Sequence, residues 1–176
     1  MSEEEKRRWT GPKDGAAAAS RLTRTNANKK LKPSSKQWVE RQLHDPYVQR
    51  AQAEGWRARA AFKLIELDEK FGLLKRGLRI VDLGAAPGGW AQVALKRGAG
   101  KIVGIDLLPV DALAGATFIE GDFLDAAKAE EVIALLGAKP DLVLSDMAAN
   151  TTGHARTDQI KTGALAEAAA EFALEH

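Results

Sequence analysis

The chain of 176 residues contains no cysteine, and it has only two methionines, one tyrosine and three histidines. The absence of cysteine excludes disulfides, thiolate zinc sites and cysteine nucleophiles. The histidines stand far apart at His44, His154 and His176, so we predict no metal site. The chain also lacks a run of 18 apolar residues and an apolar signal segment, and we therefore expect a cytoplasmic protein without a membrane span.

The small net charge of +2 conceals a difference between two parts of the chain. Residues 1–63 hold 15 Lys and Arg against 7 Asp and Glu, whereas residues 64–176 hold 11 against 17. A basic segment of this kind favours a polyanionic partner such as RNA, although a solubilising tail has the same composition. Residues 1–35 are polar and lack apolar periodicity, so we predict a disordered basic arm at 1–35 and one domain at 36–176.

The most informative stretch lies in the middle of the chain, where a short apolar run is followed by small residues. Residues 79–83 are mostly apolar and β-branched, as in a buried strand, and residues 84–89 are rich in glycine. We expect a helix after Pro87, with its free N–H groups directed back at the loop. A second strand at 101–105 ends on Asp106, about 20 residues beyond the loop, and at that offset a carboxylate binds ribose hydroxyls in nucleotide-binding folds.

The spacing of the glycines narrows the choice of ligand. The order Gly84-x-x-x-Gly88-Gly89 differs from the G-x-G-x-x-G of dinucleotide-binding loops, and the chain has no G-x-x-x-x-G-K-[ST] phosphate loop. A cofactor that carries a single adenosine fits the loop and Asp106 better than a dinucleotide does, so a dehydrogenase is the weaker alternative. Taken alone, the loop is also compatible with a turn that only packs tightly.

Strands and helices alternate along the rest of the chain. This alternation predicts an α/β fold with a doubly wound, mostly parallel, Rossmann-like sheet. The carboxyl ends of parallel strands share one edge, so Gly84, Asp106, Asp122 and Asp146 should gather there. We expect strands at 79–83, 101–105, 116–120 and 141–145, helices at 35–43, 47–54, 58–71, 126–136 and 160–174, and a polar loop at 151–158.

Four motifs, in order and in register, resemble the FtsJ/RrmJ (RlmE) family. They are DLGAAPGGW at 82–90, DLLP at 106–109, GDF at 121–123 and SDMAAN at 145–150. The resemblance implies S-adenosylmethionine as the cofactor and methylation of a ribose 2′-hydroxyl, of a uridine, in 23S-type RNA of the large ribosomal subunit during ribosome assembly. It also implies ribosomal RNA or the large subunit as the partner, and a full-length protein that is a monomer.

The resemblance assigns roles to individual residues. Lys63 and Asp146 match the first two members of the family's catalytic Lys–Asp–Lys–Glu tetrad, in which the lysine orients the substrate and the aspartate positions the ammonium. Asp122 is expected to accept a hydrogen bond from the adenine amine, Asp82 to brace the loop or approach the methionine amine, and Trp90 to lie beside the cofactor while packing in the core. Without the resemblance, Lys63 would be interpreted as a surface lysine and Asp122 as a turn or capping acid. The cofactor-binding residues so implied are Gly84, Gly88, Gly89, Trp90, Asp106, Asp122 and Asp146.

The chain departs from the family pattern after its last expected helix. The family's second lysine, its proton acceptor, stands in a Gly-Gly-x-Phe-Val-x-Lys segment, and neither this segment nor the final glutamate occurs in the 176 residues. Lys161, Glu167, Glu171 and Glu175 do not match these positions by motif. We therefore expect a domain that is incomplete at its C-terminus, lacks the last strands, binds cofactor weakly and transfers little or no methyl. The alternative function is a non-catalytic module that binds RNA or the ribosome.

Other methyl acceptors fit the sequence less well. The common route to methylation of a base at C5 requires a cysteine nucleophile, which this chain lacks. Methyltransferases that act on exocyclic amines usually carry an Asn/Asp-Pro-Pro-aromatic run, but the matching strand here ends in Ser145-Asp146-Met147-Ala148. Elimination and resemblance therefore both favour methylation of an oxygen.

Overall fold

The computed structural model describes residues 45–148 and 153–176. The basic arm predicted at 1–35 and the helix predicted at 35–43 lie outside these ranges. Contacts divide the chain into two units, Met1–Arg59 and Ala60–His176.

One helix, α3 (Pro46–Ala53), forms most of the described part of the first unit, close to the helix predicted at 47–54. Asp45 caps it, since its carboxylate accepts a hydrogen bond from the N–H of Tyr47 at 2.8 Å, and proline occupies the first helical position. Arg59 forms an ion pair with the same carboxylate. The chain leaves the helix through Gly55, whose φ angle of +74° is one that glycine adopts readily.

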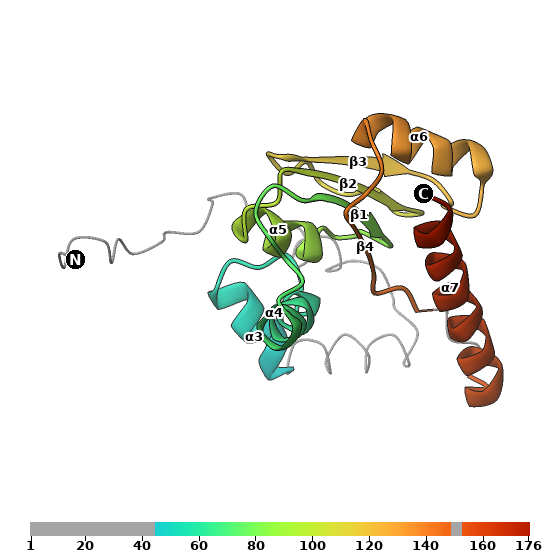
Figure 1. Cartoon of the computed structure of the whole chain (residues 1–176). Coiled ribbons are helices and arrows are strands. Elements are labelled where there is room, and N and C mark those ends of the chain that lie inside the picture. The colour runs from blue at the N-terminus through green and yellow to red at the C-terminus, as the bar shows by residue number, and fades with distance from the viewer. Residues whose placement is uncertain (1–44, 149–152) are drawn as a thin grey trace. The chain divides into compact units, whose positions relative to one another are not determined.

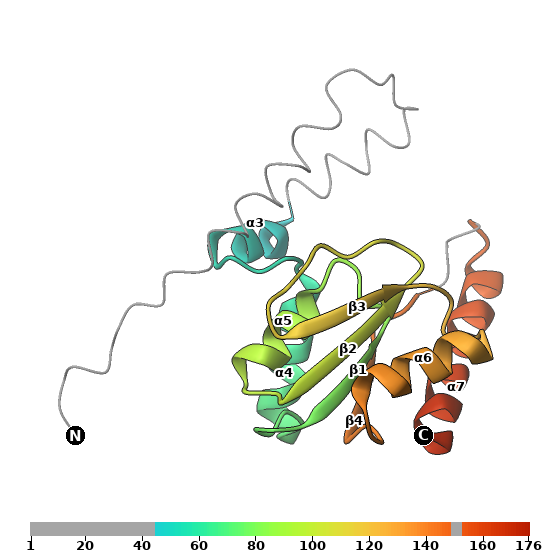
Figure 2. The ribbon, with the colours of Figure 1, turned by 90° about the horizontal axis from the view of Figure 1, so that it is seen from above.

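The second unit contains a four-stranded sheet with helices on both faces (Figure 1). The strand order is β3-β2-β1-β4, and every neighbouring pair is parallel. Helices α4 and α5 lie on one face and α6 and α7 on the other (Figure 2), which confirms the predicted doubly wound α/β fold. The elements are α4 (Ala60–Phe71), β1 (Arg79–Leu83), α5 (Gly89–Lys96), β2 (Lys101–Asp106), β3 (Ala116–Glu120), α6 (Ala126–Leu136), β4 (Leu142–Ser145) and α7 (Ala155–Glu175).

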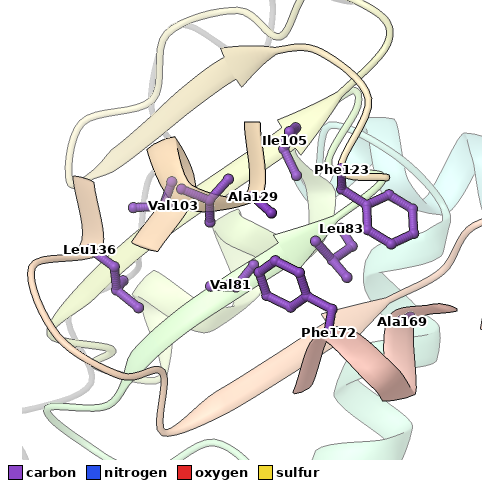
Figure 3. Close-up of a cluster of buried hydrophobic side chains, with 10 residues drawn as sticks. Val81, Leu83, Val103, Ile105, Phe123, Ala129, Leu136, Ala169 and Phe172 are labelled. Carbon is purple, nitrogen blue, oxygen red and sulfur yellow. The ribbon is translucent and has the colours of Figure 1, made fainter. Parts of the chain in front are cut away.

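Successive residues of the two central strands face opposite layers, as the two-residue period of a strand requires. Figure 3 shows a cluster of buried apolar side chains, in which Phe123 and Phe172 meet edge to face with ring centroids 6.5 Å apart. Asp82 lies between Val81 and Leu83 in β1, so its side chain is on the opposite face of this strand. It points away from the cluster towards α5. The cluster consists of Val81, Leu83, Val103, Ile105, Phe123, Ala129, Val132, Leu136, Ala169 and Phe172.

The last helix differs from the prediction. Residues 155–158 were expected in a polar loop, but they form the first turn of α7, which begins at Ala155 and not at Ile160. The carboxylate of Asp158 in this first turn suits the positive end of the helix dipole. Helix α7 packs against β4, which is an edge strand of the sheet. Within the described ranges, we find no helix that combines the length and the apolar character needed to cross a bilayer.

Candidate functional site

Two glycines shape the loop that follows β1. Gly84 and Gly88 have φ angles of +79° and +96°, which residues with a side chain rarely adopt. A Cβ atom on Gly84 would also collide with the side chain of Met147, which follows β4. The N–H groups of Gly84 and Ala85 donate to the carbonyl of Ile105 at 2.9 and 3.1 Å, and these bonds hold the loop beside the end of β2.

Helix α5 begins directly after the loop, and its N-cap residue Gly88 has no side chain with which to cap the helix. One N–H group of its first turn, that of Ala91, donates to the carboxylate of Asp82 in β1. Asp82 is only 2% exposed, and its Oδ2 atom has no hydrogen-bond partner. A buried carboxylate with one unpaired oxygen therefore lies beneath the loop, where a ligand with a hydrogen-bond donor could satisfy it.

The protonation of Asp82 reflects this environment. Burial raises the pKa of Asp82 to about 7, because desolvation penalises the charged carboxylate. The Ala91 N–H opposes the rise, whereas the nearby carboxylates of Asp106 and Asp146 add to it. Three neighbouring strands thus bring three carboxyl groups within electrostatic reach of one another, and a positively charged ligand would relieve their repulsion.

Asp106 connects the end of β2 to the loop. Its Oδ2 atom accepts a hydrogen bond from the N–H of Ala86 at 2.9 Å, and its Oδ1 atom accepts one from the N–H of Leu108 at 2.8 Å. Each carboxylate oxygen has a second acceptor site, so the group can still accept hydrogen bonds from a pair of ribose hydroxyls.

Asp122 stands two residues beyond β3, at the same edge of the sheet. Its Oδ1 atom accepts a hydrogen bond from the N–H of Leu124 at 3.0 Å, which fixes the turn after the strand. The cap of α6 is instead Asp125, whose carboxylate accepts from the N–H of Ala127 at 2.9 Å. The side chain of Asp122 is exposed and its second oxygen faces no described donor, so this residue is accessible to a ligand.

Lys63 and Asp146 are 83 positions apart in the sequence, and the structure brings them together in an ion pair. Lys63 lies in the first turn of α4, and Asp146 follows β4 directly. Their side chains are 60% and 30% exposed, so the pair is open to a large substrate. An exposed ion pair of this kind contributes only about 0–1 kcal/mol to stability. Its position beside the glycine loop therefore favours a role in the site over a role in folding.

Trp90, the second residue of α5, is 6% exposed and packs in the core, as predicted. Its indole N–H donates to the carbonyl of Ala60, the first residue of α4, at 2.8 Å. The ammonium nitrogen of Lys63 lies 5.9 Å from the centroid of the indole ring. The same tryptophan therefore contacts both the helix that carries Lys63 and the lysine itself.

The predictions from sequence missed three apolar residues at this edge. Leu107, Leu108 and Leu124 are 67%, 63% and 58% exposed. Leu107 follows Asp106, and Leu124 is two residues beyond Asp122. The signal in the sequence that could have identified them is their position, one or two residues after the acids at the ends of the strands. Apolar side chains beside two carboxylates are suited to a ligand with a flat ring and polar edges.

Residues 56–176 match the family described as FtsJ-like methyltransferase. The chain belongs to the FtsJ-like methyltransferase family. The matched residues include every site residue predicted above, from Lys63 to Asp146. Within the described part of this FtsJ-like methyltransferase, no group of three or more His, Asp or Glu residues is arranged to hold a metal ion.

Individual relatives agree with the family assignment. The chain is 51% identical, over its whole length, to the protein named ribosomal RNA large subunit methyltransferase E in Hyphomonas neptunium, and 63% identical over 80% of its length to the protein of the same name in Azorhizobium caulinodans. A solved structure described as a ribosomal RNA methyltransferase of Plasmodium falciparum is 35% identical over 60% of the chain, with a TM-score of 0.54. The chain spans 76%, 60% and 64% of the lengths of these three proteins.

Proposed function

We propose that the chain binds S-adenosylmethionine at the carboxyl edge of the sheet and that its site is built to methylate a ribose 2′-hydroxyl of large-subunit ribosomal RNA. We further propose that the acceptor is a uridine in 23S-type RNA and that the chain acts during ribosome assembly. The observation that carries it is the Lys63–Asp146 ion pair at the same edge as the glycine loop. The names of the two bacterial relatives support ribosomal RNA as the substrate.

The residues at the edge fit this donor. S-Adenosylmethionine carries a positive sulfonium and a positive ammonium, and both suit a site with the carboxyl groups of Asp82, Asp106 and Asp146. Asp106 would accept hydrogen bonds from the ribose hydroxyls and Asp122 one from the adenine amine. Leu107 and Leu124 would contact the faces of the adenine, and Gly84, Gly88 and Gly89 would allow the backbone to approach the methionine part.

The chemistry requires a nucleophile that is held in place. When bound, S-adenosylmethionine supplies an electrophilic methyl group. A ribose hydroxyl is a poor nucleophile near neutral pH, so it must be placed in line with that methyl and needs an acceptor for its proton. Asp146 holds the ammonium of Lys63, and Lys63 has further N–H donors with which to orient the hydroxyl.

The proton acceptor is the missing part. In the family this role belongs to the second lysine of the tetrad, which has no counterpart by motif among these 176 residues. Loss of general-base catalysis typically lowers a rate by about 10²–10⁴-fold. We therefore propose that the 176-residue chain binds cofactor and RNA but transfers methyl slowly, so that binding without efficient catalysis is the second candidate function for it.

Titration calorimetry of the 176-residue chain tests the choice of cofactor. We expect S-adenosylmethionine and S-adenosylhomocysteine to bind and NADH not to bind. The Asp122→Ala variant should bind the adenosine compounds more weakly, while the exposed residue Glu130 on α6 can be changed to alanine as a control for net charge. Binding of NADH in place of S-adenosylmethionine would refute the proposed function.

Transfer is tested with undermethylated large subunits and S-adenosylmethionine labelled on the methyl. The chain is used in excess over the particles, and the Hyphomonas neptunium relative is the positive control. We expect transfer to one ribose, at a rate about 10²–10⁴-fold below that of the relative. A rate equal to that of the relative would show that these residues contain a complete catalytic set, and methylation of a base would exclude the proposed acceptor.

A further inference from the structure

Polar contacts join α4 to α5 and its C-cap residue Arg97 near both ends of α4. At the end that carries Lys63, the indole N–H of Trp90 donates to the carbonyl of Ala60. Towards the other end, Arg97 forms an ion pair of 3.0 Å with Asp68, whose carboxylate also accepts from the N–H of Leu74 at 2.7 Å. Lys63 lies beside Trp90 and therefore near the first of these contacts, not the second.

The first contact reaches the loop directly. Trp90 is the second residue of α5 and follows Gly88 and Gly89, so its backbone is part of the turn that forms the proposed cofactor loop. Its indole bonds to the first residue of α4, and Lys63 is three positions further along the same helical turn. Trp90 therefore forms a direct contact between the loop and the turn from which Lys63 projects.

The lysine itself has little else to hold it. Lys63 is a long, flexible side chain that is 60% exposed, and an exposed ion pair alone restricts such a side chain weakly. Two described groups limit its ammonium, namely the carboxylate of Asp146 and the indole ring 5.9 Å away. A cation beside the face of an indole is attracted by the ring, and tryptophan gives the strongest such contact among the aromatic residues.

We propose that Trp90 is a positioning residue that holds Lys63 against Asp146 and thereby couples the conformation of the glycine loop to the Lys63–Asp146 pair. The catalytic meaning of this coupling rests on the proposed function, but the coupling itself does not. Through this link, ligand binding at the loop restricts the lysine, and by the reciprocity of coupled equilibria an ordered lysine favours the bound loop.

The test compares Trp90→Phe with Arg97→Gln. The first variant retains a ring but loses the N–H donor and weakens the attraction to the cation. The second removes the ion pairs of Arg97 with Asp68 and Glu69 of α4 and leaves Trp90 unchanged. The readout is the rate at which the Lys63 ammonium protons exchange with water in ¹H–¹⁵N spectra, since pairing with Asp146 slows this exchange. Asp146→Asn supplies the value for an unpaired lysine, and Lys75 serves as an internal reference.

In the ligand-free protein, Trp90→Phe should raise the exchange rate of Lys63 about two- to fivefold, towards the value in Asp146→Asn, while Arg97→Gln leaves it within error of wild type. An unchanged rate in Trp90→Phe overturns the proposal, and so does an equal rise in both variants, which would indicate general loosening of the helix pair. If Trp90→Phe does not fold, a nuclear Overhauser effect between the Trp90 ring and the Lys63 ε-protons in wild type decides, and its absence overturns the proposal.

The proposed function can fail separately from this inference. Addition of S-adenosylmethionine to wild-type protein should slow the exchange of Lys63 further, and Trp90→Phe should lose most of that response. If S-adenosylmethionine does not bind at all, the proposed function is wrong, whereas the result for the ligand-free variants still supports or overturns the role of Trp90.

Discussion

Replacement of Asp106 by alanine is expected to weaken the binding of S-adenosylmethionine on the order of 10²–10⁴-fold. The substitution removes two hydrogen bonds from a carboxylate to ribose hydroxyls, each worth about 1.5–3 kcal/mol, and each 1.4 kcal/mol corresponds to a tenfold change in affinity. It also removes the acceptor for the N–H of Ala86, which holds the loop to the end of β2. Titration calorimetry of the variant measures the loss directly.

Asp106→Asn separates these two effects. Asparagine keeps the shape and one acceptor oxygen, but its amide group meets an N–H donor of either Ala86 or Leu108. We expect an affinity between those of wild type and Asp106→Ala. An affinity in Asp106→Ala within about threefold of wild type, which is less than one typical hydrogen bond to a charged group, would remove Asp106 from the site.

Replacement of Asp82 by asparagine is expected to stabilise the protein in a pH-dependent manner. The pKa of Asp82 is raised from 3.8 to about 7 in the folded state. The folded state thus retains a proton that the unfolded state releases from about pH 4, so the free energy of unfolding falls as the pH rises from about 4 to about 7 and then levels off. At 1.4 kcal/mol per pH unit, this decrease amounts to roughly 2–3 kcal/mol between pH 5 and pH 8.

Asparagine does not titrate, so the Asp82→Asn variant should gain stability relative to wild type by about this amount between pH 5 and pH 8. Urea denaturation at both pH values measures the difference. Asp125→Asn is the matched control, because Asp125 is an exposed N-cap at which asparagine is equally suitable. If the stabilities of wild type and Asp82→Asn change in parallel with pH, Asp82 is not the buried titrating group described here.

The same substitution should carry a functional cost. An asparagine at position 82 has no negative charge to offer the cationic donor, so the variant should bind S-adenosylmethionine more weakly than wild type at pH 8. If the variant keeps full affinity, the unpaired oxygen of Asp82 does not contribute to cofactor binding.

The sequence predicted the strands closely because each is a short apolar run between turn residues. The runs at 79–83 and 116–120 are the strands β1 and β3 to the residue, and α6 has the same bounds as the helix predicted at 126–136. The start of α7 was wrong because the first turn of this helix is polar and resembles a loop in composition. Its buried positions, Ala169 and Phe172, lie near its other end and gave no signal for its beginning.

The site was less predictable because its contacts join residues that are far apart in the chain. Nothing local connects Lys63 with Asp146, and the exposed lysine would have been interpreted as a surface residue without the resemblance to the family. The unpaired oxygen of Asp82 and the bond from Trp90 to Ala60 depend on how β1, α5 and α4 pack. The burial of Asp68 has the same origin, since Arg97 and the N–H of Leu74 compensate its charge from other segments.

The location of the cofactor is tested most directly by mapping amide chemical shifts while S-adenosylmethionine is added. We expect the largest shift changes at the carboxyl edge, at Gly84, Gly88, Asp106, Leu107 and Asp122. The amide shifts of Gly77, Lys101 and Asp141, at the opposite edge of the sheet, should not change. Changes confined to that opposite edge, or no changes at saturating ligand, would contradict this location.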